Sequence, residues 1–261
     1  MALPSSRAVV HATLQPMATH PFLPERPPVA IAHRGGAEEA PENTVEAFAA
    51  AVALGYRYLE TDAHATRDGE VVAFHDPRLD GGGAIAELLL EEVQAVAPVP
   101  RLADVLLRWP DARVNIDPKA DECVAPLLAL LDRLDAWDRV CVGSFSDRRL
   151  RRVRGHTRGR ACTSMGPAAV AAARAAAAAT GRMPRLGARC LQVPIRWGRT
   201  PIVTPGFVRA AHRSKLHVHV WTVDDPATMH ELLDLGVDGI MTDRPRVLAE
   251  VFAARGLPLA P

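Results

Sequence analysis

The chain has 261 residues, of which 48% are hydrophobic, and its formal net charge is +1. This length supports one large core and is typical of a single α/β barrel. A nucleic-acid-binding protein should show a strong basic excess, and this chain has none. It also has no polybasic arm and no apolar run of the about 18 residues that span a bilayer. We therefore expect a protein with no nucleic-acid partner and no stable membrane insertion.

The cysteines give no sign of a metal or disulfide framework. Cys123, Cys141, Cys162 and Cys190 are far apart and show no CxxC spacing. This pattern predicts reduced, buried thiols rather than a zinc site. The N-terminus lacks the charged start, apolar core and small-residue cleavage site of a secretory signal, so we expect a cytoplasmic location.

The first 28 residues differ from the rest of the chain. Residues 1–28 carry many prolines and no sustained hydrophobic period. This composition predicts a mobile N-terminal leader, with a strap lying on the folded domain as the alternative. Residues 29–261 are expected to form a single domain.

Short apolar runs alternate with helical patterns along that domain. Nine runs are predicted as strands, at residues 29–32, 56–61, 71–74, 112–116, 139–142, 160–163, 189–193, 216–221 and 239–241. Helices are predicted between them, including residues 45–55, 101–107, 121–135, 147–153, 167–180, 205–213 and 226–235. Asn43 is a candidate N-cap for the first helix, with Glu46 as its back-bonding partner.

One of the nine strands does not fit a parallel sheet. Only residues 63–70 separate the second strand and Asp62 from the run at 71–74, whereas a parallel crossover needs about a dozen residues. The intervening Arg67-Asp68-Gly69-Glu70 is typical of a hairpin turn. The remaining eight strands predict a (β/α)8 TIM barrel with a short β-hairpin insertion after the second strand.

Polar side chains cluster at the ends of these strands. Glu60 and Asp62 are two residues apart in a strand, so they leave the same face, and Asp117 and Lys119 do the same. His33 follows the first strand. TIM barrels keep their active sites at the carboxyl ends of the strands. The hairpin should add His75 to this face, near Glu60.

These residue types suit phosphate-ester chemistry at a metal. Glu60, Asp62 and Asp117 offer only oxygen ligands, which favours Ca²⁺ or Mg²⁺ over zinc. The alternative for each acid is an ion pair at the barrel rim. Arg34 and Lys119 supply the positive charge that a phosphate needs, although Lys119 could also pair with Asp117.

Two histidines could move the protons. His33 and His75 are the candidate acid and base of an ester cleavage. Trp221, at the end of a strand, could pack against glycerol or another apolar part of a ligand. His217 and His219 are expected to be hydrogen-bonded filling inside the barrel. Structural roles are also expected for His64, His156, His212 and His230.

One loop carries two further arginines. Arg196 and Arg199 follow the seventh of the nine predicted strands, at residues 189–193, and could contact a substrate. Solvated side chains are the more common state of arginines in such loops, and we prefer that interpretation.

The motifs together resemble those of the glycerophosphodiester phosphodiesterases. The resemblance runs from about residue 30 to residue 245 and rests on HRG at 33–35, PENT at 41–44, Glu60-x-Asp62, TRDGEVVAFHD at 66–76, NIDPK at 115–119, Trp221-Thr222 and GVDGIMTDRP at 236–245. It implies a TIM-barrel phosphodiesterase domain over residues 29–261. The implied reaction is metal-dependent cleavage of a glycerophosphodiester into sn-glycerol 3-phosphate and an alcohol.

The resemblance also implies individual roles. His33 and His75 would be the acid/base residues, and Arg34 and Lys119 would hold the phosphate. The metal would lie on Glu60, Asp62 and the acid of the NIDPK motif.

Two departures from the family pattern stand out. Asp117 occupies a position where the family usually has Glu, and its side chain is one methylene shorter. The segment after His75, PRLDGGGAIAE at residues 77–87, is a shortened form of a loop that usually contains Arg-Thr-Thr and lies over the site.

Two other functions stay open at this point. A phospholipase D-like enzyme of the same barrel group would be expected to show an apolar rim or a secretory signal, and neither is evident in the sequence. A non-catalytic binder would be expected to lack one of His33, Glu60, Asp62 or His75, and all four are present. The alcohol group, the choice of metal and the oligomeric state are not predicted.

Overall fold

The computed structural model describes residues 20–25 and 27–259. Eight parallel strands form one curved sheet, in the order β6-β5-β4-β2-β1-β11-β10-β7. A parallel bridge between Ser164 and Cys190 joins its two end strands, so the barrel is nearly closed. The strands are β1 (Val29–Ala32), β2 (Tyr58–Ala65), β4 (Arg113–Pro118), β5 (Val140–Val142), β6 (Cys162–Thr163), β7 (Cys190–Pro194), β10 (His217–Trp221) and β11 (Gly239–Thr242).

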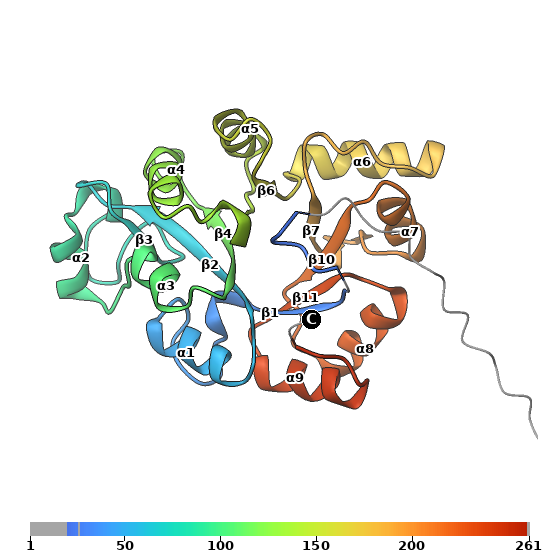
Figure 1. Ribbon diagram of the computed structural model, residues 1–261, viewed down its shortest axis with the longest axis horizontal. Coiled ribbons are helices and arrows are strands. Elements are labelled where there is room, and N and C mark those ends of the chain that lie inside the picture. Colours follow the sequence, from blue (N-terminus) through green and yellow to red (C-terminus); the bar gives the residue numbers. More distant parts are fainter. Residues whose placement is uncertain (1–19, 26, 260–261) are drawn as a thin grey trace, which may run out of the picture.

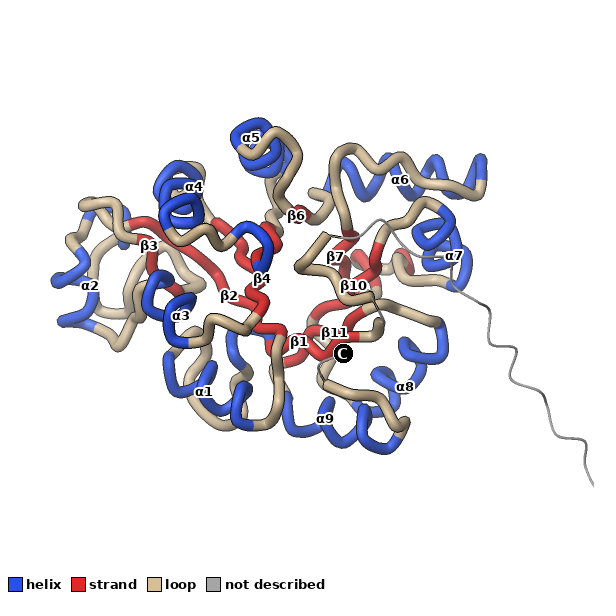
Figure 2. Tube along the Cα trace, in the orientation of Figure 1, coloured by secondary structure: helices blue, strands red, loops and turns tan. Residues whose placement is uncertain are grey.

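Helices surround the strands, as Figures 1 and 2 show. The predicted TIM barrel is therefore confirmed. The helices are α1 (Val45–Ala53), α2 (Leu90–Val96), α3 (Leu102–Arg108), α4 (Val124–Arg133), α5 (Asp147–His156), α6 (Pro167–Thr180), α7 (Pro205–Arg213), α8 (Pro226–Leu235) and α9 (Pro245–Ala254). Short 3₁₀ turns lie at His33–Gly35, Ile85–Glu87 and Trp137–Arg139. The sequence reading missed α9, which buries Leu248, Val251 and Phe252.

Two hairpins interrupt the alternation. β3 (Val71–Ala73) pairs antiparallel with the end of β2, with Ala63 opposite Ala73, which confirms the predicted insertion. The second hairpin consists of β8 (Arg196–Trp197) and β9 (Thr200–Pro201). It replaces the plain loop expected after the strand at residues 189–193, and it brings Trp197 to the mouth of the barrel.

The described part of the predicted leader packs on the barrel, as the strap alternative expects. Phe22 is only 1% exposed and meets the ring of Tyr58 edge-on. The Tyr58 hydroxyl donates a hydrogen bond to the backbone carbonyl of Phe22. The rest of the predicted leader, residues 1–19 and 26, lies outside the described residues.

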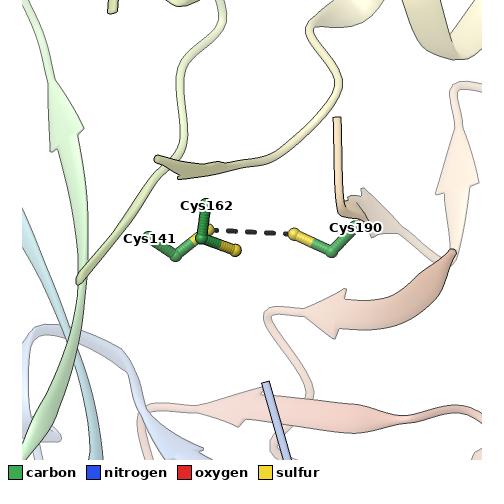
Figure 3. Close-up of side chains that lie close together, drawn as sticks. All are labelled: Cys141, Cys162 and Cys190. Carbon is green, nitrogen blue, oxygen red and sulfur yellow. Dashed lines mark hydrogen bonds between the residues drawn. The ribbon is translucent and has the colours of Figure 1, made fainter. Parts of the chain in front are cut away.

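Three thiols lie together in the buried core of the barrel, in a cluster with apolar side chains such as Ile31, Tyr58 and Met241. Cys141, Cys162 and Cys190 come from the adjacent strands β5, β6 and β7, and all four cysteines of the chain are free and buried, as predicted. Figure 3 shows three of them facing one another, with 3.8 Å between the sulfurs of Cys141 and Cys190. Strand adjacency, rather than sequence spacing, brings them together.

Two histidines are also buried in the core of the barrel. His217 and His219 are buried on β10, as expected for barrel filling. The expected hydrogen bonds are missing for His219, because neither of its ring nitrogens has a partner among the described residues. Burial lowers the pKa of His217 to about 4, so its ring is neutral at pH 7.

In the described part of the chain, no helix is both long and apolar enough to cross a membrane. The cytoplasmic location stays a prediction.

Candidate active site

All eight site residues predicted from the sequence line one cavity at the carboxyl ends of the strands. The cavity has a volume of about 670 Å³. The fold therefore brings together the residues that the sequence analysis singled out, and their role in the reaction stays a prediction. The eight residues are His33, Arg34, Glu60, Asp62, His75, Asp117, Lys119 and Trp221.

His33 is held at the end of β1 by two acids. Its Nδ1 lies 2.6 Å from Asp243 Oδ1, and its Nε2 lies 3.7 Å from Glu60 Oε2. Burial alone would lower the pKa of His33, but the negative charges of Glu60 and Asp243 outweigh it and raise that pKa. The tight turn that follows depends on Gly35 (φ +83°), where a Cβ would come within 2.9 Å of the backbone of Ala47.

Asp62 lies at the centre of the charged side of the cavity. Lys119 Nζ lies 2.6 Å from one of its oxygens, and Arg34 Nε lies 2.9 Å from the other. The amide of Asn43 donates a third contact, 3.1 Å long. These partners fix the carboxylate in place and compensate its charge inside the barrel.

The prediction that Asn43 caps the first helix is wrong. Thr44 is the N-cap, because its hydroxyl accepts the backbone N–H of Ala47. Asn43 instead takes a left-handed conformation (φ 57°) and turns its side chain toward β2. There its amide oxygen accepts a hydrogen bond from Thr61, while its amide nitrogen holds Asp62. Asn43 is therefore a support of the site.

Glu60 and Asp117 flank Asp62 and are less completely paired. Burial raises the pKa of Glu60 to about 7, although His33 opposes this shift. Burial also raises the pKa of Asp117, with Lys119 acting against it. Asp117 Oδ2 lies 3.0 Å from Lys119 Nζ, while its buried Oδ1 has no hydrogen-bond partner among the described residues. An unpaired buried oxygen beside two further carboxylates fits a hard cation.

The side-chain oxygens of Glu60, Asp62 and Asp117 do not converge on a single position for a metal ion. In the described part of the chain, only Cys141, Cys162 and Cys190 place three candidate ligand atoms within 4.8 Å of one another. Between Asp62 and Asp117 lies the ammonium group of Lys119, 2.6 and 3.0 Å from their oxygens. Lys119 therefore supplies the positive charge that a divalent cation would also supply.

His75 enters the cavity from the hairpin. The backbone N–H of Phe74 donates to the carbonyl of Asp62, which places His75 just beyond the ladder with β2. Its Nδ1 contacts Asp76 at 2.8 Å, and its side chain is 41% exposed. The structure thus brings His75 to the same cavity as Glu60. No residue of the shortened loop at 77–87 is among those that line the cavity.

Sequence reasoning missed two polar residues of the cavity floor. Gln192 donates a 2.8 Å hydrogen bond to the side-chain oxygen of Asn115, and both residues line the cavity. Asn115 lies two residues before Asp117 on the same face of β4, in register with Glu60 of β2. The NIDPK motif contained Asn115, and strand alternation with Asp117 was the signal that could have found it.

The opposite wall of the cavity is apolar. Phe145 and Trp221 meet edge-on with ring centroids 5.5 Å apart, and Trp197 of the β8–β9 hairpin also lines the cavity. Arg196 and Arg199 of the same hairpin are exposed and do not line it. This supports the solvated interpretation of the two arginines.

Comparisons with known proteins agree with this geometry. A model of the glycerophosphoryl diester phosphodiesterase family matches residues 33–247. A Mycobacterium tuberculosis protein named probable glycerophosphodiester phosphodiesterase 2 is 42% identical over 250 residues, covering 90% of this chain and 94% of that relative. A glycerophosphodiester phosphodiesterase from Caldanaerobacter subterraneus is 28% identical, covering 87% of this chain and 98% of the relative.

Solved structures show the same fold. A glycerophosphodiester phosphodiesterase from Agrobacterium tumefaciens superposes with a TM-score of 0.70 at 26% identity, covering 85% of this chain and 99% of that one. An Oleispira antarctica phosphodiesterase has a TM-score of 0.72 at 20% identity, covering 87% of this chain and 97% of its own. With its barrel, its cavity and the family match over residues 33–247, this chain is an enzyme that belongs to the glycerophosphoryl diester phosphodiesterase family.

Proposed function

We propose that this enzyme is a metal-dependent hydrolase that cleaves glycerophosphodiesters to sn-glycerol 3-phosphate and an alcohol. One observation carries the proposal: three carboxylates, two cationic side chains and two histidines line a single cavity. The Oleispira antarctica phosphodiesterase of the same fold was solved in complex with the product sn-glycerol-3-phosphate.

The charged residues divide between metal and phosphate. Glu60, Asp62 and Asp117 would hold Ca²⁺ or Mg²⁺, which when bound supplies Lewis-acid polarisation of the phosphoryl oxygens. Arg34 and Lys119 line the same cavity and would hold the phosphoryl group through charge-assisted hydrogen bonds. Arg34 and Lys119 both contact Asp62, and these contacts keep the two side chains directed toward the site of the phosphoryl group.

The two histidines would move the protons of the reaction. Asp243 binds the Nδ1 of His33 and so leaves its Nε2 facing Glu60 and the cavity. Because the pKa of His33 is raised, its protonated form is favoured relative to a free imidazole, which suits it to be the proton donor to the leaving alkoxide. His75 would then accept a proton from the attacking nucleophile. We further propose that residues 29–261 act as one catalytic domain.

The test is release of glycerol 3-phosphate from glycerophosphodiesters with several head groups, measured with EDTA and then with added Mg²⁺ or Ca²⁺. We expect release that depends on the metal and falls at least ~10²-fold in His33→Ala. His230→Ala, a histidine on α8 outside the cavity, is the matched control and should retain full activity. Equal activity of His33→Ala and wild type would contradict the assigned role.

A further inference from the structure

One wall of the active-site cavity has no part in the proposed reaction. Apart from Arg174 of α6, the charged residues of the cavity come from the ends of β1, β2 and β4 and from the β3 hairpin. The remaining lining comes from β5 to β7, the start of α6, the β8–β9 hairpin and β10, on the other side of the barrel mouth (Figure 1). Its apolar members are Phe145, Met165, Pro167, Val170, Ala171, Val193, Pro194, Trp197, Ile202 and Trp221.

Two aromatic side chains of this wall stand open to solvent. Phe145 is 55% exposed and Trp197 is 61% exposed. Large exposed aromatics next to a cavity mark a surface that binds something apolar. Phe145 contacts Trp221 edge-on, so the apolar surface continues from the rim to the strand end beside the charged residues. The structure thus supplies the apolar rim that the sequence alone did not reveal.

The wall is also long. Residues from Pro167 to Arg174 of α6 line it, which at helical rise is about 10 Å along the helix. Met165, Val193 and Ile202 form a buried surface beneath the rim, each less than 10% exposed. A cavity of about 670 Å³ is in the range that encloses a drug-sized ligand. A glycerophosphodiester with a small alcohol leaves most of this wall uncovered.

The charges of the wall do not suit an ammonium head group. The acids that line the cavity, Glu60, Asp62 and Asp117, all stand on the opposite side. The one charged residue on the apolar side is Arg174, which makes no ion pair or hydrogen bond with the described residues and lines the cavity on α6. A choline or ethanolamine group would meet a like charge there and no counter-charge.

We propose that this wall binds a long apolar chain of the substrate, so that the preferred substrates are amphiphilic glycerophosphodiesters such as lysophospholipids; this inference rests on the proposed function. The phosphodiester lies on the charged side and the chain runs along the aromatic rim and α6. Water supplies the oxygen that bonds to phosphorus, the bond from phosphorus to the alcohol oxygen breaks, and the alcohol leaves with a proton. A monoacyl glycerol 3-phosphate remains when the chain is on the glycerol.

The test compares kcat/KM along two substrate series, below the concentrations at which they form micelles. One series carries acyl chains of zero to eight carbons on the glycerol of glycerophosphomethanol, whose two sides are chemically distinct. The other carries the chain on the alcohol, as glycerophospho-1-alkanols. In at least one series we expect kcat/KM to rise about twofold or more per added methylene, and the series that rises shows which side of the diester carries the chain.

Two variants of the hairpin make the test specific. Trp197→Ala should reduce the ratio of kcat/KM between the eight-carbon and the chain-free substrate at least fivefold. Arg199→Ala, exposed in the same hairpin and not lining the cavity, should leave that ratio and both activities unchanged. A kcat/KM that is flat or falls with chain length in both series would overturn the proposal. A higher value for glycerophosphocholine than for any chain-bearing substrate would also overturn it.

The experiment distinguishes failure of the proposed function from failure of the inference about the apolar wall. Lack of any hydrolysis in either series, with every metal, would refute that function alone. Calorimetry with octyl phosphate against ethyl phosphate then tests the wall directly. Octyl phosphate should bind at least tenfold more tightly to wild type and to Arg199→Ala, with the gain reduced in Trp197→Ala. Equal affinities for the two phosphates would overturn the inference.

Discussion

The barrel interior holds two layers of ionisable side chains that are built in opposite ways. The layer at the carboxyl ends of the strands keeps its charges: Asp62 contacts Arg34 and Lys119 and borders an open cavity. The layer below contains Cys141, Cys162 and Cys190 with His217 and His219, all at most 3% exposed.

Burial acts on both layers, with different outcomes. In the lower layer, burial raises the pKa of the Cys141 and Cys162 thiols and lowers that of His217, so these three groups are neutral at pH 7. The pKa of the Cys190 thiol is lowered instead, because of its hydrogen bonds with Cys141 and Cys162. In the upper layer, cationic side chains compensate the negative charge of the carboxylates, which also border the open cavity. The two layers differ because cationic side chains compensate the carboxylates beside the cavity, whereas the lower layer is closed off from solvent. We therefore expect the lower layer to serve stability.

Among the substitutions considered, Glu60→Gln in the upper layer should reduce activity the most. It keeps the size of the side chain but removes a metal ligand and the charge that faces His33, so we expect activity to fall at least ~10³-fold. Glycerol 3-phosphate release measures this, and circular dichroism should show an intact fold. Activity within tenfold of wild type would remove Glu60 from the site.

In the absence of metal, Glu60→Gln should be more stable than wild type. The pKa of Glu60 is raised from 4.5 to about 7 in the folded state. Its contribution to stability is therefore complete below pH 4.5 and is lost as the pH rises through about 7. At pH 8, in EDTA, we expect Glu60→Gln to unfold in urea with a free energy about 2 kcal/mol above that of wild type. A lower stability than wild type under these conditions would contradict the raised pKa.

Lys119→Met should have the second-largest effect. It removes the ammonium between Asp62 and Asp117 while keeping the length of the side chain. Because one phosphate contact is lost, we expect kcat/KM to fall about 10²-fold. Steady-state kinetics would check this, with Lys215→Met as the control, because Lys215 is exposed in the turn that follows α7. A Lys119→Met enzyme as active as that control would leave Lys119 with a structural role only.

Metal affinity should depend on pH through the same carboxylates. A proton on Glu60 competes with the cation, so affinity for Mg²⁺ or Ca²⁺ should rise with pH and level off above about 7. From pH 8 to pH 6 we expect it to fall by about tenfold, as measured by titration calorimetry. Proton release on binding at pH 6.5, seen as heat that varies with the buffer, is the second readout. An affinity that does not change over this range would show that Glu60 is not a ligand.

Cys162→Ser should disturb only the lower layer and have the smallest effect. A hydroxyl in place of a buried thiol adds a polar group beside Cys141 and Cys190, and we expect the free energy of unfolding to fall by about 1–2 kcal/mol. The activity per folded molecule should not change. Urea unfolding and an assay of the same preparation would check both, and a loss of activity in folded Cys162→Ser would link the two layers.

The sequence predicted those parts of the site that depend on local spacing. Glu60 and Asp62 were placed on one face by strand alternation, and the short stretch between β2 and β3 predicted the hairpin that carries His75. Asn43 was misassigned because helix capping explained its position fully, and its contact with Asp62 crosses between separate elements.

Sequence patterns could not predict contacts between segments that are far apart in the chain. The three thiols meet because β5, β6 and β7 are neighbours around the barrel, which no spacing of cysteines reveals. The apolar rim likewise forms from separate segments, because Phe145 follows β5 whereas Trp197 lies in the β8–β9 hairpin after β7. In each case the information lies in which strands are adjacent.

The account is tested most directly by following glycerophosphoglycerol hydrolysis by ³¹P NMR for wild type, Glu60→Gln and Cys162→Ser, each with Mg²⁺ or Ca²⁺ and with EDTA. We predict a phosphomonoester signal of glycerol 3-phosphate that grows for wild type and Cys162→Ser only with metal, and does not grow for Glu60→Gln. Equal product from Glu60→Gln, or metal-independent product from any of the three, would contradict the assignment of chemistry to the upper layer.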